Sequence, residues 1–149
     1  GKDLRMKHRV CLVGRPSGWA KEAGAEFQKR IGRYTQIECV HLREEAKVED
    51  ELINQCERGW WSICLDPQGK SHTTEEWKNE WEKLERAGHT RLVWMIGGAN
   101  GFSKGFRARC HAVRAMGPQT LSHDLALVVL LEQIYRLESW RAGHPYHRA

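Results

Sequence analysis

The sequence contains no apolar run close to the ~20 residues that a helix needs to cross a bilayer. It also lacks a basic segment followed by an apolar stretch at its start, the pattern of a secretion signal. We therefore expect a cytoplasmic protein with no membrane partner. Met6-Lys7 is a more natural start than Gly1, so we expect residues 1–5 to be a cloning remnant or an unusual extension.

Cysteine pairs with metal-binding or redox spacing are also absent. The five cysteines are an odd number, none belongs to a C-x-x-C motif, and four lie in apolar surroundings. His144 and His147 are three residues apart but have no cysteine or carboxylate partners nearby. We expect no bound metal, and we interpret the thiols as small buried side chains in a reducing compartment.

Two common phosphate-binding signatures are missing as well. The glycine-rich segment 96–101 is neither G-x-G-x-x-G nor G-x-x-x-x-G-K-[ST]. Taken alone, it is best interpreted as a tight connection in which glycine supplies a positive φ. A second loop, Met116 to Leu121, contains Gly117-Pro118 and favours the alternative that both loops bring backbone close to a small ligand.

What the chain does contain is typical of one globular domain over residues 1–149. Its 149 residues, 40% hydrophobic and 29% charged, are enough for a core of its own. Twenty-four basic residues outnumber 19 acidic ones, and the pI is about 9.1. A basic excess of this size fits a nucleic-acid partner without establishing one.

Short apolar runs alternate with amphipathic segments along the chain. They predict strands at 9–13, 37–42, 60–65 and 91–96, and helices beginning at Ser17, over 44–58, after a capping box at Thr73 and Glu76, and over 122–141. The stripes expected to face the core are Trp19, Ala23, Phe27 and Ile31 in the first helix, and Trp77, Trp81 and Leu84 in the third. Asp66-Pro67-Gln68-Gly69 predicts a turn that ends the third strand.

This alternation predicts an α/β fold with a mostly parallel sheet flanked by helices. In such folds ligands bind beyond the carboxyl ends of the strands. Leu65-Asp66 and Ile96-Gly97-Gly98 both lie at such ends.

The last predicted helix is apolar on nearly all sides from Leu125 to Leu131. In a domain of this size, such a helix suggests that a second subunit provides part of its cover. Glu132 and Arg136 follow at i, i+4 spacing. They form either an ordinary ion pair within the helix or part of a polar cluster at the edge of a binding site, and spacing leaves both open.

Several C-terminal motifs occur together: MIGGANG (95–101), TLSHDLA (120–126), VVLLEQIYR (128–136) and HPYHR (144–148). With LDPQGK (65–70), they resemble the SPOUT-class methyltransferases of the RlmH type, which modify a pseudouridine of large-subunit (23S) ribosomal RNA. The resemblance covers nearly the whole chain from Met6. EQ-x-YR followed by a terminal PYHR is its most specific part.

The resemblance implies a homodimer whose C-terminal segment forms a trefoil knot, an exception to the rule that chains avoid knots. It implies S-adenosylmethionine as the cofactor, bound in the knotted loops, and ribosomal RNA or the ribosome as the partner. The cofactor contacts that it implies are Leu65, Gly97, Met116, Gly117, Pro118, Gln119, Thr120 and Leu121.

The implied reaction is methyl transfer from a sulfonium to N3 of pseudouridine, an imide nitrogen that has to lose its proton. The resemblance in the C-terminal tail, together with residue type, implies a catalytic group of five residues: Glu132, Arg136, Tyr146, His147 and Arg148. By residue type, His147 is the best candidate for the base. The arginines would hold phosphate or developing negative charge, Tyr146 would stack on the nucleobase, and Glu132 would orient Arg136.

Two positions depart from the family pattern. Ser122 stands where proline is usual and can still cap the helix. Leu127 replaces an arginine, so a contact with RNA or a partner subunit from that position would have to come from another residue. Two other classes remain as alternatives: a non-catalytic RNA-binding module, which would not need two intact glycine loops, and a structural dimer, which would leave HPYHR without a role.

Overall fold

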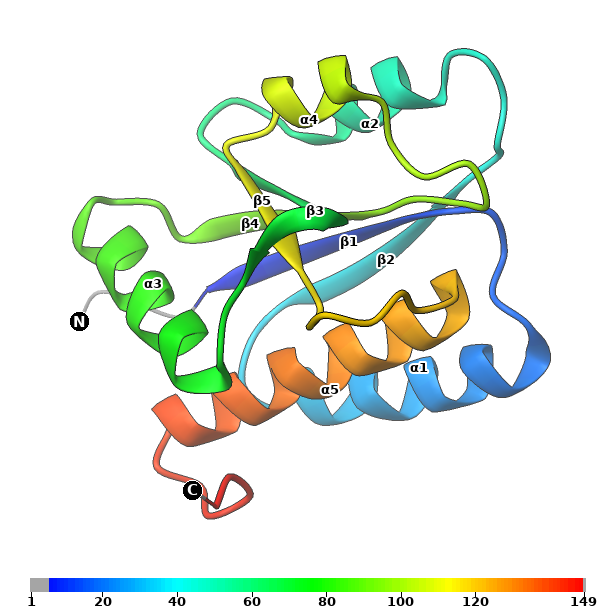
Figure 1. Cartoon of the computed structure of the whole chain (residues 1–149). Helices are drawn as coiled ribbons and strands as arrows, with labels where there is room; N and C mark the ends of the chain where they lie inside the picture. Colours follow the sequence, from blue (N-terminus) through cyan, green and yellow to red (C-terminus); the bar gives the residue numbers. More distant parts are fainter. Residues whose placement is uncertain (1–5, 149) are drawn as a thin grey trace.

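The computed structural model describes residues 6–148, which form a three-layer α/β fold (Figure 1). Residues 1–5, expected to be a remnant or extension, lie outside the described residues. The elements are β1 (Lys7–Val13), α1 (Gly18–Ile31), β2 (Ile37–Leu42), α2 (Val48–Gln55), β3 (Trp61–Ser71), α3 (Thr74–Arg86), β4 (Arg91–Ile96), α4 (Lys104–Arg109), β5 (Ala112–Ala115) and α5 (His123–Arg141). None of the helices in this described part is long and apolar enough to cross a membrane.

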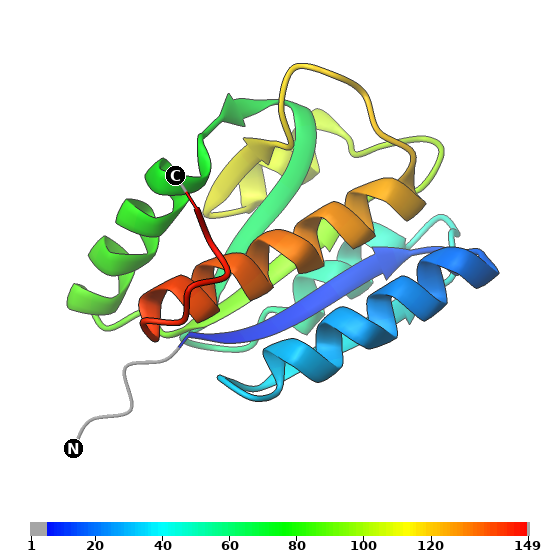
Figure 2. The same ribbon diagram turned by 90° about the horizontal axis from the view of Figure 1, so that it is seen from below.

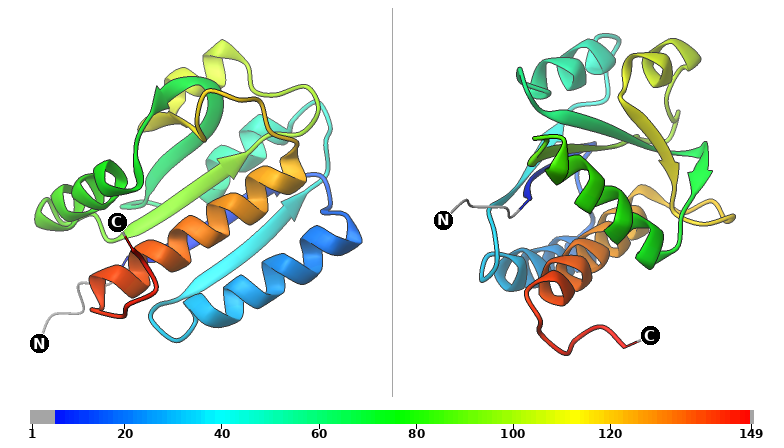
Figure 3. Two further views of the ribbon diagram at one scale, coloured as in Figure 1. Left: turned by 60° about the horizontal axis from the view of Figure 1, so that its bottom comes forward. Right: turned by 90° about the vertical axis from the view of Figure 1, so that its left-hand side faces the viewer.

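The five strands pair in the order β2-β1-β4-β3-β5, and every pair is parallel. Helices α1 and α5 lie side by side on one face of the sheet, with α3 beside them, and α2 and α4 cover the other face (Figures 1 and 3). Because both faces are covered, the inner strands β1 and β4 are largely apolar. The predicted α/β class with a parallel sheet flanked by helices is confirmed.

Each face of the sheet has its own core. On the α1 and α5 side, Trp77 and Trp81 of α3 pack against Trp94 of β4, with ring centroids 5.4 and 6.0 Å apart, which confirms the inner stripe predicted for α3. On the other side, Leu52 of α2 and Phe106 of α4 pack with the central strands. Two of the five free cysteines are buried, and three are half-buried.

The inner stripe predicted for α1 is wrong at its first residue. Trp19 is 52% exposed, whereas Ala20, Gly24 and Ile31 are buried. This buried face packs on α5: a Cβ at Gly24 would lie 3.5 Å from Leu131 Cδ1, in ordinary van der Waals contact. The face of α1 that packs on α5 therefore runs through Ala20, Gly24 and Ile31, which leaves Trp19 outside.

The predicted turn at residues 66–69 does not end β3, which continues to Ser71. Asp66 Oδ1 does accept a hydrogen bond from Gln68 N at 2.8 Å, as turn chemistry predicts. The result is only a shift in the pairing with β5 between Leu65 and Lys70, after which the ladder resumes. Gly69 allows this close pairing, because a Cβ there would lie 2.6 Å from Arg114 N.

Helix α2 is shorter than predicted, Val48–Gln55 instead of 44–58, and α4 and β5 were not predicted. Helix α5 agrees closely with its predicted range. Its N-cap is Ser122, whose hydroxyl accepts from Leu125 N at 3.2 Å, and α3 begins with the predicted capping box.

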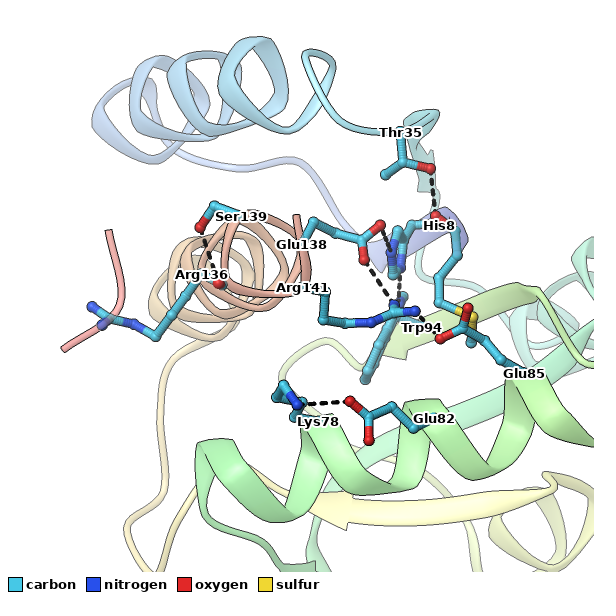
Figure 4. A network of polar contacts seen from close by, with 11 residues as sticks. His8, Thr35, Lys78, Glu82, Glu85, Trp94, Arg136, Glu138, Ser139 and Arg141 are labelled. Atoms are coloured by element: carbon cyan, nitrogen blue, oxygen red, sulfur yellow. Dashed lines mark hydrogen bonds and ion pairs between the residues drawn. The ribbon is translucent and has the colours of Figure 1, made fainter. Parts of the chain in front are cut away.

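A buried polar network holds the C-terminal half of α5 in place (Figure 4). Glu138 is 4% exposed; its Oε1 accepts from Arg141 Nη1 at 3.0 Å, and its Oε2 lies 3.6 Å from His8 Nε2 in β1. His8 Nδ1 in turn accepts from Trp94 Nε1 at 3.0 Å. Arg141 also pairs with Glu85 of α3. The network thus fixes α5 against β1, β4 and α3.

Replacing Glu138 with alanine should lower the free energy of unfolding by roughly 3 kcal/mol, because the change removes a buried carboxylate that accepts from Arg141 and faces His8, and leaves a cavity. Urea denaturation measures this loss. The matched control is Glu26→Ala, which removes an exposed pair with Arg30 at 3.1 Å and should cost less than about 0.5 kcal/mol. Equal losses in the two variants would contradict an anchoring role for the network.

Candidate active site

A pocket of about 450 Å³ opens at the carboxyl edge of the sheet, a volume suited to a small organic ligand. It is lined by the strand end at Leu65, the loop after β4, the loop after β5 and the first turn of α5. Figure 2 shows the two loops arching near each other over the start of α5. Parallel pairing is what brings them together, since all strands end at one edge.

Most of the predicted cofactor residues line this pocket. They are Leu65, Gly97, Met116, Gln119, Thr120 and Leu121. Gly117 and Pro118 belong to the same loop but do not line the pocket, and Gly117 has a φ of 103°. The structure therefore brings six of these residues around one cavity and assigns the other two to the bend of the loop.

The loop after β4 needs glycine mainly for space. Neither Gly97 nor Gly98 has a positive φ, and in this loop only Gly101 does, at 62°. A Cβ at Gly97 would lie 3.3 Å from the Phe102 ring, and one at Gly98 would lie 2.5 Å from Glu44 Oε2. The interpretation as a turn that needs positive φ holds for Gly101 alone.

Two serine–carboxylate pairs fix the helices at the edge of the pocket. Ser103, the N-cap of α4, donates from N and Oγ to Glu49 of α2 at 2.8 and 2.7 Å. Ser17, the N-cap of α1, donates in the same way to Asp124 of α5 at 3.0 and 2.7 Å. Sequence reasoning missed both carboxylates, because acidic residues are common in the first turn of any helix.

The pocket lining includes two titratable side chains, Asp66 and His123. Asp66 is 7% exposed, accepts from Gln68 N, and lies 3.8 Å from Arg107 Nη1 through Oδ2. His123 Nε2 lies 3.4 Å from Asp124 Oδ1. Within residues 6–148 no group of three or more histidine, cysteine or acidic side chains is arranged to hold a metal ion.

A second polar cluster lies at the other end of α5. Glu132 Oε2 accepts from Arg136 Nη2 at 2.7 Å and from Tyr146 Oη at 2.8 Å. Arg136 Nη1 lies 3.2 Å from His147 Nδ1. Burial opposes ionisation of Glu132, but these hydrogen bonds outweigh it and lower the pKa of its carboxyl group. Four of the five predicted catalytic residues thus lie together, and Arg148 is exposed beside them.

The tail is bound to its own helix. The Tyr146 ring packs 4.5 Å from that of Tyr135, and the His147 ring stacks on Trp140 at 4.1 Å. The i, i+4 pair of Glu132 and Arg136 is therefore both an ion pair and part of a larger cluster. Helix α5 rises roughly 15 Å from Ala126, which lines the pocket, to Arg136, so the cluster and the pocket of one chain are separate.

The outer face of α5 is not fully covered in a single chain. Leu125 is 44% exposed, Val128 and Val129 are half-buried, and the exposed Trp19 lies near the start of the neighbouring α1. A single chain therefore leaves part of this helix uncovered, and the expected cover by a second subunit stays a prediction. Leu127, by contrast, is 3% exposed and packs in the core, so no charged group is presented at this position.

Comparison with known proteins identifies the class. The family described as predicted SPOUT methyltransferase matches residues 6–147. The chain therefore belongs to the SPOUT methyltransferase family, which confirms both the resemblance found in its motifs and the predicted class of enzyme.

Curated relatives narrow the class further. Ribosomal RNA large subunit methyltransferase H of Thermus thermophilus is 37% identical over 144 residues, covering 96% of this chain and 99% of the relative. Proteins of the same name from Deinococcus radiodurans and Geobacter metallireducens are 32% and 34% identical, with 96% and 97% of this chain covered and 99% and 100% of each relative.

Solved structures agree in fold. A probable methyltransferase from Bordetella pertussis has a TM-score of 0.57 at 10% identity and covers 89% of this chain and 96% of its own. The SpoU methyltransferase AviRb from Streptomyces viridochromogenes, solved with AdoMet, has a TM-score of 0.52 at 12% identity and covers 94% of this chain and 60% of its own. At such low identity the likeness is one of fold.

Changing Gly97 to valine should abolish binding of S-adenosylmethionine, because a branched side chain would collide with Phe102 or fill the pocket. Isothermal calorimetry measures the binding, and circular dichroism tests whether the fold survives. Gly105→Ala is the control: a Cβ there has only Ser103 Oγ within reach, at 4.0 Å, so binding should be unchanged. Normal binding by the valine variant would mean that Gly97 does not border the ligand.

Proposed function

We propose that this protein transfers a methyl group from S-adenosylmethionine to N3 of a pseudouridine in large-subunit ribosomal RNA. Family membership supports the reaction class and the cofactor, and the names of the curated relatives support ribosomal RNA as the substrate. The RlmH-type motifs support pseudouridine as the modified nucleotide and N3 as the atom that receives the methyl group. The structural observation that carries the proposal is the pocket built from both glycine loops.

The pocket fits the cofactor chemically. Leu65, Ile96 and Leu121 provide apolar surface for an adenine ring, and the glycines leave loop backbone open to hydrogen bonding. No lysine or arginine is among the described residues that line it, so a cationic ligand meets no like charge. When bound, S-adenosylmethionine supplies a methyl group already activated as a sulfonium. The protein's task is then to align the acceptor nitrogen and exclude water.

We further propose that the segment from Gly97 to Ser122 is knotted. The chain leaves β4, crosses to the far side of β3 to form β5, and returns to begin α5 beside the loop after β4. A threaded connection would keep the two loops closed around the ligand without a lid.

We also propose that two chains pair through the outer face of α1 and α5. The support is the apolar surface left at Trp19 and Leu125, together with the separation of the tail cluster from its own pocket. In such a dimer the tail of one chain approaches the pocket of the other. There Arg136, Tyr146, His147 and Arg148 engage the RNA, with Glu132 holding Arg136. A ribosomal substrate supports a cytoplasmic location, which we also propose.

Changing Leu125 to glutamate should convert the dimer to a monomer, because it places a charge in an apolar contact. Light scattering at micromolar concentration measures the mass, which for the unchanged protein should be about twice the 17.3 kDa of one chain. The control is Asn54→Glu, which places the same charge at an exposed position of α2, on the other face of the sheet, and should keep the dimer. A wild-type protein with the mass of one chain contradicts the proposed pairing.

The unchanged protein should methylate large-subunit rRNA, detected by mass spectrometry of digested RNA. The double variant His147→Ala, Arg148→Ala should reduce this activity about 100-fold, since it removes two polar contacts to RNA of about 1.5 kcal/mol each. Dimer mass and cofactor affinity should be unchanged. Wild-type methylation by the double variant would mean that the tail does not engage the substrate; loss of cofactor affinity would mean that the tail supports the pocket instead.

A further inference from the structure

One imidazole lies in the pocket itself. His123 is the first residue of α5 and lines the cavity together with both glycine loops. Its side chain is 34% exposed, so it can meet a substrate that enters from solvent. The groups facing it are Asp124 on its own helix, Ser17 at the start of α1 through Asp124, and Asp66 of β3 across the pocket.

The carboxylate of Asp124 favours one tautomer of this imidazole. Two hydrogen bonds from Ser17 lower the pKa of the Asp124 carboxyl group, which favours the ionised form, an acceptor only. His123 Nε2 lies 3.4 Å from this carboxylate, too far for a well-formed hydrogen bond, but the negative charge there favours the tautomer with its proton on Nε2. That leaves a lone pair on Nδ1, for which the structure gives no partner within residues 6–148.

His147 is in the opposite situation. Its Nδ1 lies 3.2 Å from Arg136 Nη1, and a guanidinium only donates hydrogen bonds. Nδ1 is thus the acceptor, so the neutral ring has its proton on Nε2 and its one lone pair is already occupied. Asp66 is engaged as well, by Gln68 N and Arg107. Of these three candidates, His123 has the lone pair that is free.

We propose that His123 is the catalytic base that accepts the N3 proton of the target nucleotide, with Asp124 as its positioning residue. This inference rests on the proposed function. The N3–H bond breaks and its proton moves to His123 Nδ1, while the nitrogen's electron pair forms the new bond to the methyl carbon. The methyl–sulfur bond breaks with its electron pair left on sulfur. The imidazolium next to Asp124 then returns its proton to water.

The test compares His123→Gln, Asp124→Asn and His147→Gln in single-turnover methylation of rRNA across pH. The His123 variant should lose about 100-fold in rate at neutral pH, within the range for one general base, and its rate should keep rising with pH as hydroxide takes over. Its affinity for S-adenosylmethionine, measured by calorimetry, should stay within about threefold of wild type, because a glutamine can fill the same space.

The Asp124 variant gives an independent measurement without cofactor or RNA. Loss of the carboxylate removes the charge that favours a proton on Nε2, so the ¹⁵N chemical shifts of the His123 ring, which report its tautomer, should change, and the methylation rate should fall. Thermal unfolding checks that the variant is folded. The His147 variant should keep the wild-type dependence of rate on pH and the wild-type ¹⁵N shifts of the His123 ring, and it should raise the concentration of RNA needed for half-maximal rate.

The outcomes separate the inference from the proposed function. The inference is overturned if His123→Gln methylates at the wild-type rate with the wild-type dependence on pH. It is also overturned if the loss of that dependence on pH occurs in His147→Gln and not in His123→Gln. If the unchanged protein binds cofactor but leaves rRNA unmethylated at every pH, the proposed function itself fails, and the role of His123 falls with it.

Discussion

Parallel pairing of β4, β3 and β5 is the constraint on which the rest of this structure depends. Because the three strands run the same way, the chain leaves β4 and β5 at the same edge, on either side of the end of β3. The loops that follow close over Leu65 from both sides. The pocket at this edge is therefore a consequence of strand order.

Helix α5 connects the pocket to the polar cluster near the C-terminus. Its first turn lines the pocket, and its last turns carry the cluster of Glu132, Arg136 and the tail. The buried contacts of Glu138 and Arg141 keep the helix from sliding on the sheet (Figure 4). The same rigid element thus joins the pocket at one end to the cluster that we propose contacts the RNA at the other.

The longer elements were predictable because their own residues specify them. The capping box of Thr73 and Glu76 and the tryptophan stripe of α3 are examples. Strand β5 was not predictable: it has four residues, with Arg114 among them. That arginine is accommodated by Glu80 of α3, at 3.1 and 3.2 Å, a partner 34 positions away. A contact of this kind is absent from local sequence patterns, and so is the exposure of Trp19.

The same distinction applies to the site. The family resemblance implied eight contact residues, and six of them line the pocket, because its motifs lie on strand ends and on the loops that follow them. The groups that hold those loops were missed. In the sequence, Glu49 and Asp124 look like the acidic residues that are common in the first turn of any helix. Only the fold shows that each accepts two hydrogen bonds from a serine far away in the sequence.

The central claim is that two loops at one sheet edge enclose S-adenosylmethionine while the tail serves the RNA. Backbone hydrogen exchange, followed by mass spectrometry with and without S-adenosylmethionine, tests it most directly. Exchange should slow in residues 97–103 and 116–126 and stay unchanged in residues 144–148. The account would be contradicted if the cofactor slowed exchange only in the tail, or if it slowed exchange in neither of the two loops.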